Sequence, residues 1–206
     1  MSMDKPFRVE VSVDAPRDVV WRTLTEPEQI RHWFGWDYDG LNDEIELIFV
    51  EHARLRTPDR IEMSDDGLIE LEERDGRTVI RATKPGDLDA VEWVDVYGDI
   101  EEGWIPFFNQ LRHRLERHSD STRRMIVRNA NLAALPELPG EPWHSSRYQR
   151  GADSDGALAI VFRKPDTGES MLLVTTYDLD DDAFAAVERR WDEWTAQLTP
   201  SGQTRP

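Results

Sequence analysis

The chain has 206 residues and a formal net charge of −17, and such an acidic surface disfavours partners that are themselves anionic, such as nucleic acids and acidic membranes. It has no cysteine, which excludes disulfides, thiol catalysis and cysteine-based zinc sites. No signal-peptide core and no run of roughly 18 apolar residues is present, so a cytoplasmic protein without a membrane partner is expected.

The N-terminal segment predicts a strand followed by two short helices. Residues 7–14 alternate apolar and polar side chains, as in a half-buried strand. Pro16 suits the first turn of a following helix. Thr25 and Glu28 have the spacing of a capping box, which predicts a second helix ending at Gly35.

The next segment predicts an antiparallel meander of short strands. The apolar run 45–50 predicts a strand that ends near His52, and Pro58 divides the following segment into two edge pieces. Asp75-Gly76 is a strong two-residue hairpin turn between strands at 68–73 and 78–82. A further turn is expected at 84–87.

A long helix over residues 101–117 follows the meander. Its apolar side chains form a single stripe at helical spacing, and cationic residues crowd its C-terminal end, where they suit the helix dipole. The stripe indicates a core helix that can also roof a ligand cavity. It consists of Trp104, Phe107, Phe108, Leu111 and Leu115.

After residues 119–121 the chain predicts a second, smaller α+β unit. The expected elements are a strand at 123–129, a weak helix at 132–138, a strand at 143–150, a loop at 151–156, a hairpin of 158–162 with 171–177, and a final helix capped by Asp180 or Asp181. The apolar face of that helix comprises Phe184, Val187, Trp191, Trp194 and Leu198. The order of elements nearly repeats that of the first unit, so a duplication and an extension with its own small core are both open interpretations.

Residues 1–118 resemble the START-like (SRPBCC) superfamily and, more narrowly, bacterial homologues of the ATPase activator of heat-shock protein ninety. The resemblance is carried by Asp14-Ala15-Pro16, Val20-Trp21, Leu24-Thr25-Glu26-Pro27-Glu28, Trp33-Phe34 and Glu101-Glu102-Gly103-Trp104. It implies an α+β helix-grip fold, in which a curved antiparallel sheet wraps around a long C-terminal helix. An apolar cavity is expected between the sheet and this helix. Residues 119–206 then form an α+β extension outside this pattern.

Motifs for catalysis or cofactor binding are missing from the sequence. None of the five histidines has the spacing of a metal site, no Gly-x-Ser-x-Gly elbow occurs and no phosphate-binding glycine loop is present. Neither a cofactor nor a metal is therefore expected. The numerous paired carboxylates fit solvated turns and helix caps.

The predicted site is the cavity between sheet and long helix. Apolar pockets commonly carry a few polar groups that orient the ligand, and Tyr38, His52, Arg54 and Tyr97 are candidates for that role. The predicted ligand-binding residues are Trp33, Phe34, Trp36, Phe49, His52, Trp93, Tyr97, Trp104, Phe107, Phe108 and Leu111. Each aromatic residue has plain core packing as its alternative.

Three functions are compatible with this site. The first is non-catalytic binding of a small hydrophobic or aromatic molecule. The second is a protein-interaction role, as a co-chaperone, a stress-response adaptor or a homodimer. The third is an enzyme of cyclase or hydrolase type that uses polar residues of the cavity, for which His52 and Tyr97 are the residues to test.

Overall fold

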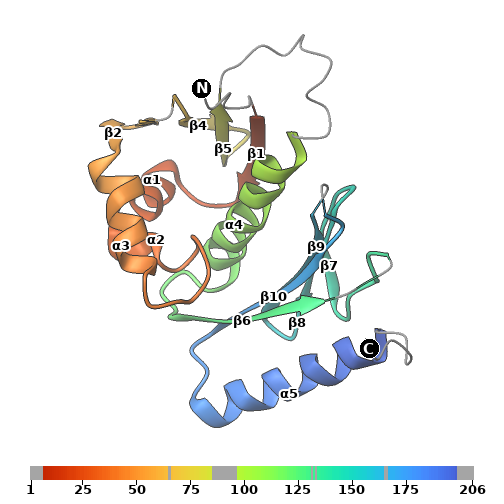
Figure 1. Ribbon diagram of the computed structural model, residues 1–206. Helices are drawn as coiled ribbons and strands as arrows, with labels where there is room; N and C mark the ends of the chain where they lie inside the picture. The colour runs from red at the N-terminus through yellow and green to blue at the C-terminus, as the bar shows by residue number, and fades with distance from the viewer. Residues whose placement is uncertain are drawn as a thin grey trace. The chain divides into compact units, whose positions relative to one another are not determined.

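The computed structural model describes residues 7–64, 66–84, 97–130, 132, 134–164 and 167–198 (Figure 1). The chain divides into two compact units, Met1–Ser121 and Thr122–Pro206. Each unit has a five-stranded antiparallel sheet and ends in a long helix. Among the described residues, no helix has both the length and the apolar character needed to cross a membrane.

The first unit is an α+β helix-grip fold. Its sheet has the strand order β1-β5-β4-β3-β2, and α4 lies along β1 (Figure 1). The elements are β1 (Phe7–Val13), α1 (Arg17–Thr25), α2 (Pro27–Ile30), α3 (Leu41–Ile45), η1 (Glu46–Glu51), β2 (Ala53–Arg56), β3 (Arg60–Met63), β4 (Leu68–Arg74), β5 (Arg77–Lys84) and α4 (Tyr97–Arg117).

The two faces of this sheet follow the predicted alternation. Val9 and Val11 of β1 lie opposite Ala82 and Ile80 of β5, and directly opposed residues of an antiparallel pair share a face. That inner face is apolar and contributes to the core together with Phe108 of α4. The Asp75-Gly76 turn is confirmed, because both residues have positive φ, as a two-residue type I′ turn requires.

The outer face carries a ladder of ion pairs between strands. Arg81 of β5 contacts Glu10 of β1 at 2.9 Å and Glu72 of β4 at 3.4 Å. Farther along, Arg60 of β3 contacts Glu70 of β4 at 2.8 Å. These charges keep the outer face in water and therefore fix which face of each strand meets the core.

The prediction of a strand at 45–50 is wrong. These residues continue α3 into a π-helical segment, η1, and the buried side chains are Leu41, Ile45 and Phe49. Their spacing of four residues fits a helix face, whereas Ile45, Leu47 and Phe49 also satisfy strand alternation. The helical pattern prevails because it buries Phe49 while Leu47 stays exposed.

The capping role predicted for Thr25 is also wrong. The helix α1 extends through this residue, and the Thr25 hydroxyl donates to the carbonyl of Trp21 within it. Glu26 precedes α2 without a side-chain cap, and Pro27 occupies the first turn as expected.

The second unit repeats the strand order of the first. Its sheet has the order β6-β10-β9-β8-β7, so the first strand again pairs with the last strand of a four-stranded meander. The helix α5 covers one face of this sheet (Figure 1). The elements are β6 (Arg123–Ala130), β7 (Glu141–Ser145), β8 (Gln149–Ser154), β9 (Ala157–Arg163), β10 (Ser170–Tyr177) and α5 (Asp181–Leu198).

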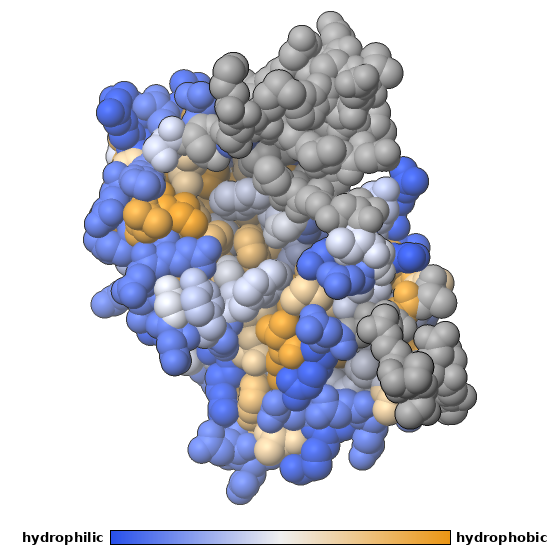
Figure 2. Space-filling model, viewed as in Figure 1, coloured by the Kyte–Doolittle hydropathy of each residue, from blue (hydrophilic) through white to orange (hydrophobic). Residues whose placement is uncertain are grey.

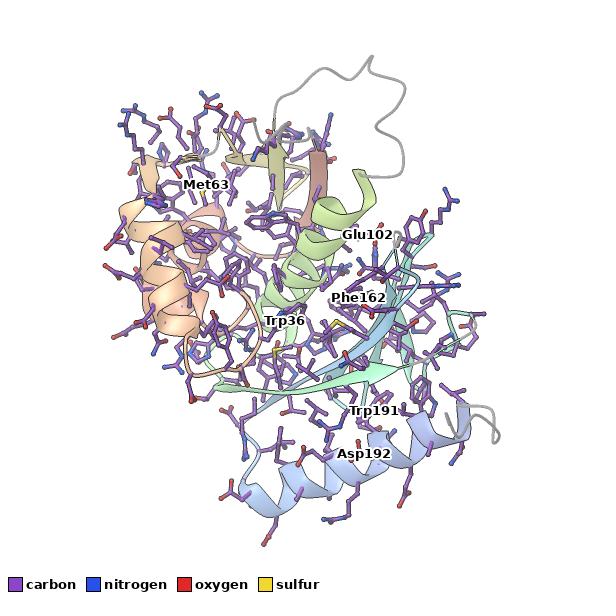
Figure 3. All side chains as sticks on the ribbon, viewed as in Figure 1. Trp36, Met63, Glu102, Phe162, Trp191 and Asp192 are labelled. Carbon is purple, nitrogen blue, oxygen red and sulfur yellow. The ribbon has the colours of Figure 1, made fainter. Side chains whose placement is uncertain are left out.

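The predicted apolar face of α5 is confirmed. All five side chains belong to a core that also includes Ile126 of β6 and Val174 of β10. Trp191 is 1% exposed, and Figure 3 shows it pointing from α5 toward the strands. The Asp180 carboxylate caps the helix by accepting the backbone N–H of Ala183 at 2.8 Å.

Three predictions for the second unit are wrong. The described residues between 132 and 140 are irregular and not helical, since Pro136, Pro139 and Gly140 follow closely on the leucines. The segment 143–150 contains parts of two strands, and 149–154 is β8 and not a loop. The turn lies at Asp155-Gly156, where both residues have positive φ.

Candidate functional site

A cavity of about 220 Å³ lies inside the first unit, at the end of the sheet where η1, the β3–β4 connection and α4 come together. Its walls are mostly apolar, with a few polar groups. The lining residues are Ile48, His52, Met63, Ser64, Gly67, Leu68, Ile69, Ala82, Thr83, Lys84 and Trp104.

Backbone hydrogen bonds hold the rim of the cavity together. The Ser64 N–H donates to the carbonyl of His52 at 2.8 Å, which ties the end of η1 to the end of β3. The Met63 N–H donates to the carbonyl of Gly67 at 2.8 Å across the β3–β4 connection. Figure 3 shows Met63 between η1 and the strands, as its place in the lining requires.

The apolar floor of the cavity comes from the inner face of the sheet. Ile69 of β4 lies opposite Ala82 of β5, and both are 2% exposed. Alternation along β5 then places Lys84 on the same face, two residues beyond Ala82. Lys84 is 7% exposed, so most of its side chain is covered by the protein.

Most of the predicted ligand-binding aromatics form a continuous core cluster. The ring centroids of Phe34 and Phe49 are 4.9 Å apart in an edge-to-face arrangement, and those of Phe34 and Phe107 are 5.0 Å apart. Trp33 packs against Phe49 and Phe108, and its indole N–H donates to the buried carbonyl of Thr23 at 2.9 Å. This geometry is that of structural packing.

The predicted site residues therefore separate into groups. His52 and Trp104 line the cavity, and Trp104 also contacts Phe108 of the cluster at 5.5 Å. Trp36, labelled in Figure 3, packs on Phe107 with ring centroids 5.2 Å apart. The remaining cluster members that do not line the cavity are Trp33, Phe34, Phe49, Phe107, Phe108 and Leu111.

The other polar candidates, apart from His52, are not among the residues that line the cavity. Tyr38 is 50% exposed and donates to Glu44 at 2.7 Å, which places it outside the cavity lining. Arg54 lies on β2 and is exposed. Tyr97 begins α4, and Trp93 lies outside the described residues.

Several lining residues were missed at the level of sequence. Ile48, Met63 and Ile69 were treated only as parts of strands, and Lys84 as part of a turn. The alternation of Thr78, Ile80, Ala82 and Lys84 is the signal that would have placed the lysine on the core face.

Three apolar side chains near the cavity in the chain are exposed to solvent. Leu47 and Val50 of η1 are 45% and 43% exposed, and Leu55 of β2 is 47% exposed. Figure 2 shows the corresponding apolar patch over α3 and η1. The same π-helical segment thus presents Ile48 to the cavity and apolar side chains to solvent.

The resolved electrostatic shifts in this unit lie away from the cavity. Arg8 and Arg81 hold the pKa of Glu10 below its usual value, and Arg56 and Arg74 do the same for the pKa of Glu62 and Glu72 respectively. All of these carboxylates lie in the outer ladder. Within the described residues, no group of three or more His, Asp or Glu is placed to hold a metal ion.

No family model matches the chain, and no curated protein matches it. Similar solved structures include the crystal structure of DynU16, a protein in the dynemicin biosynthetic locus, at 17% identity and a TM-score of 0.37, covering 95% of this chain and 97% of that one. The solution structure of the Aha1 dimer from Colwellia psychrerythraea has 12% identity and a TM-score of 0.40, with 56% of this chain and 98% of that one covered. The di-domain ARO/CYC BexL from the BE-7585A biosynthetic pathway has 11% identity and a TM-score of 0.35 over 94% of each chain. At these scores we draw no functional argument from them.

Proposed function

We propose that the first unit binds a small apolar or aromatic molecule in the cavity between the end of its sheet, η1 and α4. The observation that carries the proposal is the cavity itself, about 220 Å³ in volume and lined by Ile48, Met63, Ile69, Ala82 and Trp104 together with a few polar groups. This combination of apolar wall and convergent polar groups is typical of small-molecule sites.

The size of the cavity limits the ligand. An apolar cavity of about 150 Å³ accepts a benzene molecule, so this larger one suits a bicyclic aromatic or a branched aliphatic compound. Trp104 offers a ring surface on which a planar ligand can stack.

The direct test is NMR with methyl-labelled protein, titrated with 2-naphthamide as a neutral bicyclic probe. We expect the methyl signals of Ile48, Met63 and Ile69 to shift together, while those of Ile126 in the second unit stay in place. Calorimetry then supplies the dissociation constant.

A cavity-filling variant provides the matched control. Ala82→Leu fills space beside Ile69 and should weaken 2-naphthamide binding at least ten-fold, about 1.4 kcal/mol. Ala186→Leu makes the same change at an exposed position of α5 and should leave binding unaltered. If Ile48 and Ile69 do not respond to the probe in wild-type protein, the proposal fails.

A protein-interaction role is the second candidate, since Leu47, Val50 and Leu55 expose apolar side chains close together in the chain. A co-chaperone role is the form that the sequence resemblance implies, and a homodimer is the other form of this candidate. Sedimentation velocity at several concentrations, with Leu47→Ser/Val50→Ser as the comparison, tests the dimer. A sedimentation coefficient that is constant with concentration and identical in both proteins would count against it.

A further inference from the structure

We infer that the ligand of the cavity carries a hydroxyl group at one end, and that this group hydrogen-bonds to the imidazole of His52 at the mouth of the cavity. The inference rests on the proposed function, because it names the class of ligand and its orientation in the same cavity. The expected ligand is a compact aromatic or branched alcohol or phenol, with its apolar body against Ile69 and Ala82.

The lining residues form a gradient from solvent to core. His52 and Ser64 line the cavity and are nevertheless exposed, so they mark the place where it opens to solvent. Ile69 and Ala82 also line it and are each 2% exposed, which makes their part the deep end. Burial favours apolar surface and disfavours a polar group without a partner. A ligand with one polar end therefore binds with its apolar end inward.

The backbone fixes the position of His52. This residue directly follows η1, and its N–H donates to the carbonyl of Leu47 at 3.0 Å. Its carbonyl accepts the N–H of Ser64 at 2.8 Å, so the two residues at the mouth are joined directly. The imidazole is thus attached to a fixed backbone, which reduces the conformational freedom lost on binding.

The polar side chains at the mouth are available to a ligand. In the part of the chain that the structure describes, neither the His52 imidazole nor the Ser64 hydroxyl takes part in a hydrogen bond or an ion pair. A neutral imidazole has one N–H donor and one acceptor nitrogen, and a hydroxyl group also combines both functions. A hydroxyl on the ligand therefore finds a complementary partner whichever way its proton points.

The charges around the cavity favour a neutral ligand. None of the described residues that line it is Asp or Glu, so a cation would have no carboxylate beside it. The chain has a net charge of −17, so its surface does not attract an anion. Lys84 of the lining already takes part in an interaction within the protein. A hydroxyl group matches the mouth without bringing a charge.

The experiment compares 2-naphthol with 2-methylnaphthalene, which share one ring system and nearly the same size, but of which only the first has a hydroxyl group. Both are titrated into methyl-labelled wild-type protein, His52→Leu, His52→Gln and His32→Leu, and the methyl signals of Ile69 report binding of either compound. His32→Leu is the matched control, because it makes the same change in the turn after α2, at a residue outside the cavity lining.

We expect His52→Leu to weaken the binding of 2-naphthol about five-fold, the effect of one neutral hydrogen bond, and not to weaken that of 2-methylnaphthalene. His52→Gln keeps a donor and an acceptor and should retain part of the affinity for 2-naphthol, and His32→Leu should bind both compounds as wild type does. If His52→Leu weakens the binding of both compounds equally, or of neither, the inference is overturned while the proposed function stands. If the signals of Ile69 respond to neither compound in wild-type protein, the proposed function itself has failed.

A second measurement does not depend on the variants. The ring-nitrogen signals of His52 in isotope-labelled wild-type protein should shift on addition of 2-naphthol and much less on addition of 2-methylnaphthalene, because a hydrogen bond acts directly on a ring nitrogen. Nuclear Overhauser contacts should place the hydroxyl-bearing ring of 2-naphthol near His52 and its other ring near Ile69. Equal shifts with the two compounds, or the opposite orientation, would overturn the inference even if the His52 variants do not fold.

Discussion

The carboxylate of Glu116 in α4 accepts a hydrogen bond from the guanidinium of Arg77 in β5 at 2.9 Å. This ion pair joins the long helix to the sheet. The same carboxylate accepts the backbone N–H of Asp14 at 2.9 Å and the side chain of Arg112 at 3.2 Å. Its side chain is only 13% exposed, so one residue secures the end of β1, the start of β5 and the last turns of α4.

We therefore predict that Glu116→Ala destabilises the first unit by about 2 kcal/mol, because it removes a partly buried acceptor shared by several donors. Urea unfolding followed by circular dichroism measures the change. The control is Glu73→Ala, whose 3.9 Å contact with Arg17 is largely exposed and which should change stability by less than about 0.5 kcal/mol. Equal effects of the two substitutions would contradict the assigned role of Glu116.

Phe49→Ala tests the aromatic cluster. Phe49 is 3% exposed and packs edge-to-face on Trp33 and Phe34, so its truncation should cost about 3–5 kcal/mol. Its neighbour Val50 is 43% exposed, and Val50→Ala should stay within about 0.5 kcal/mol of wild type. Thermal unfolding distinguishes the two variants. A small loss of stability in Phe49→Ala would contradict the assignment of this residue to the core.

Trp191→Ala tests whether the second unit has a core of its own. The substitution should cost that unit about 3–5 kcal/mol, because Trp191 is 1% exposed within the cluster around α5. Asp192→Ala removes only an exposed partner of Arg128 and should cost less than about 1 kcal/mol. Hydrogen exchange measured by mass spectrometry should show lost protection in 122–198 and retained protection in β1, β4 and β5; loss throughout the chain would argue for a single cooperative unit.

The outer ladder predicts a loss of stability in acid. The pKa of Glu10, Glu62 and Glu72 is lower in the folded protein than the ordinary value of 4.5, so the ionised forms stabilise the fold above that pH. This contribution disappears as the pH falls below 4.5 and through the folded pKa values. Glu10→Gln should lower stability at pH 7 and make the fall between pH 6 and pH 3 shallower. An identical slope for wild type and Glu10→Gln would show that the Glu10 ion pairs do not contribute.

The sequence predicts most of the fold because its local signals agree with its tertiary structure. Alternation in β1, the Asp75-Gly76 turn and the stripe of α5 each have one good structural solution. The segment 41–51 does not, because Leu41, Ile45 and Phe49 fit a helix while Ile45, Leu47 and Phe49 fit a strand. Only packing of the whole unit decides between these two patterns.

The candidate site was harder to predict than the fold. An aromatic residue suits a core and a ligand pocket equally well, so composition pointed to Phe34 and Phe108, which the structure places in the cluster. The cavity lies beside this cluster and is lined by residues such as Met63 and Ala82. Methionine and alanine are common in any protein core, so their presence in the sequence does not indicate a binding site. Lysine is rarely buried, but the place of Lys84 on the inner face appears only when the strand is known to extend to this residue.

The strand order shared by the two units has a consequence for synthesis. β1 ends at Val13, and its pairing partner β5 begins only at Arg77; likewise β6 ends at Ala130 and β10 begins at Ser170. Each first strand therefore leaves the ribosome long before its neighbour is synthesised. Until then its backbone N–H and C=O groups lack their partner strand. Such distant pairings make folding slow, and the charged residues Arg8 and Glu10 on β1 help to keep the waiting strand from joining another chain.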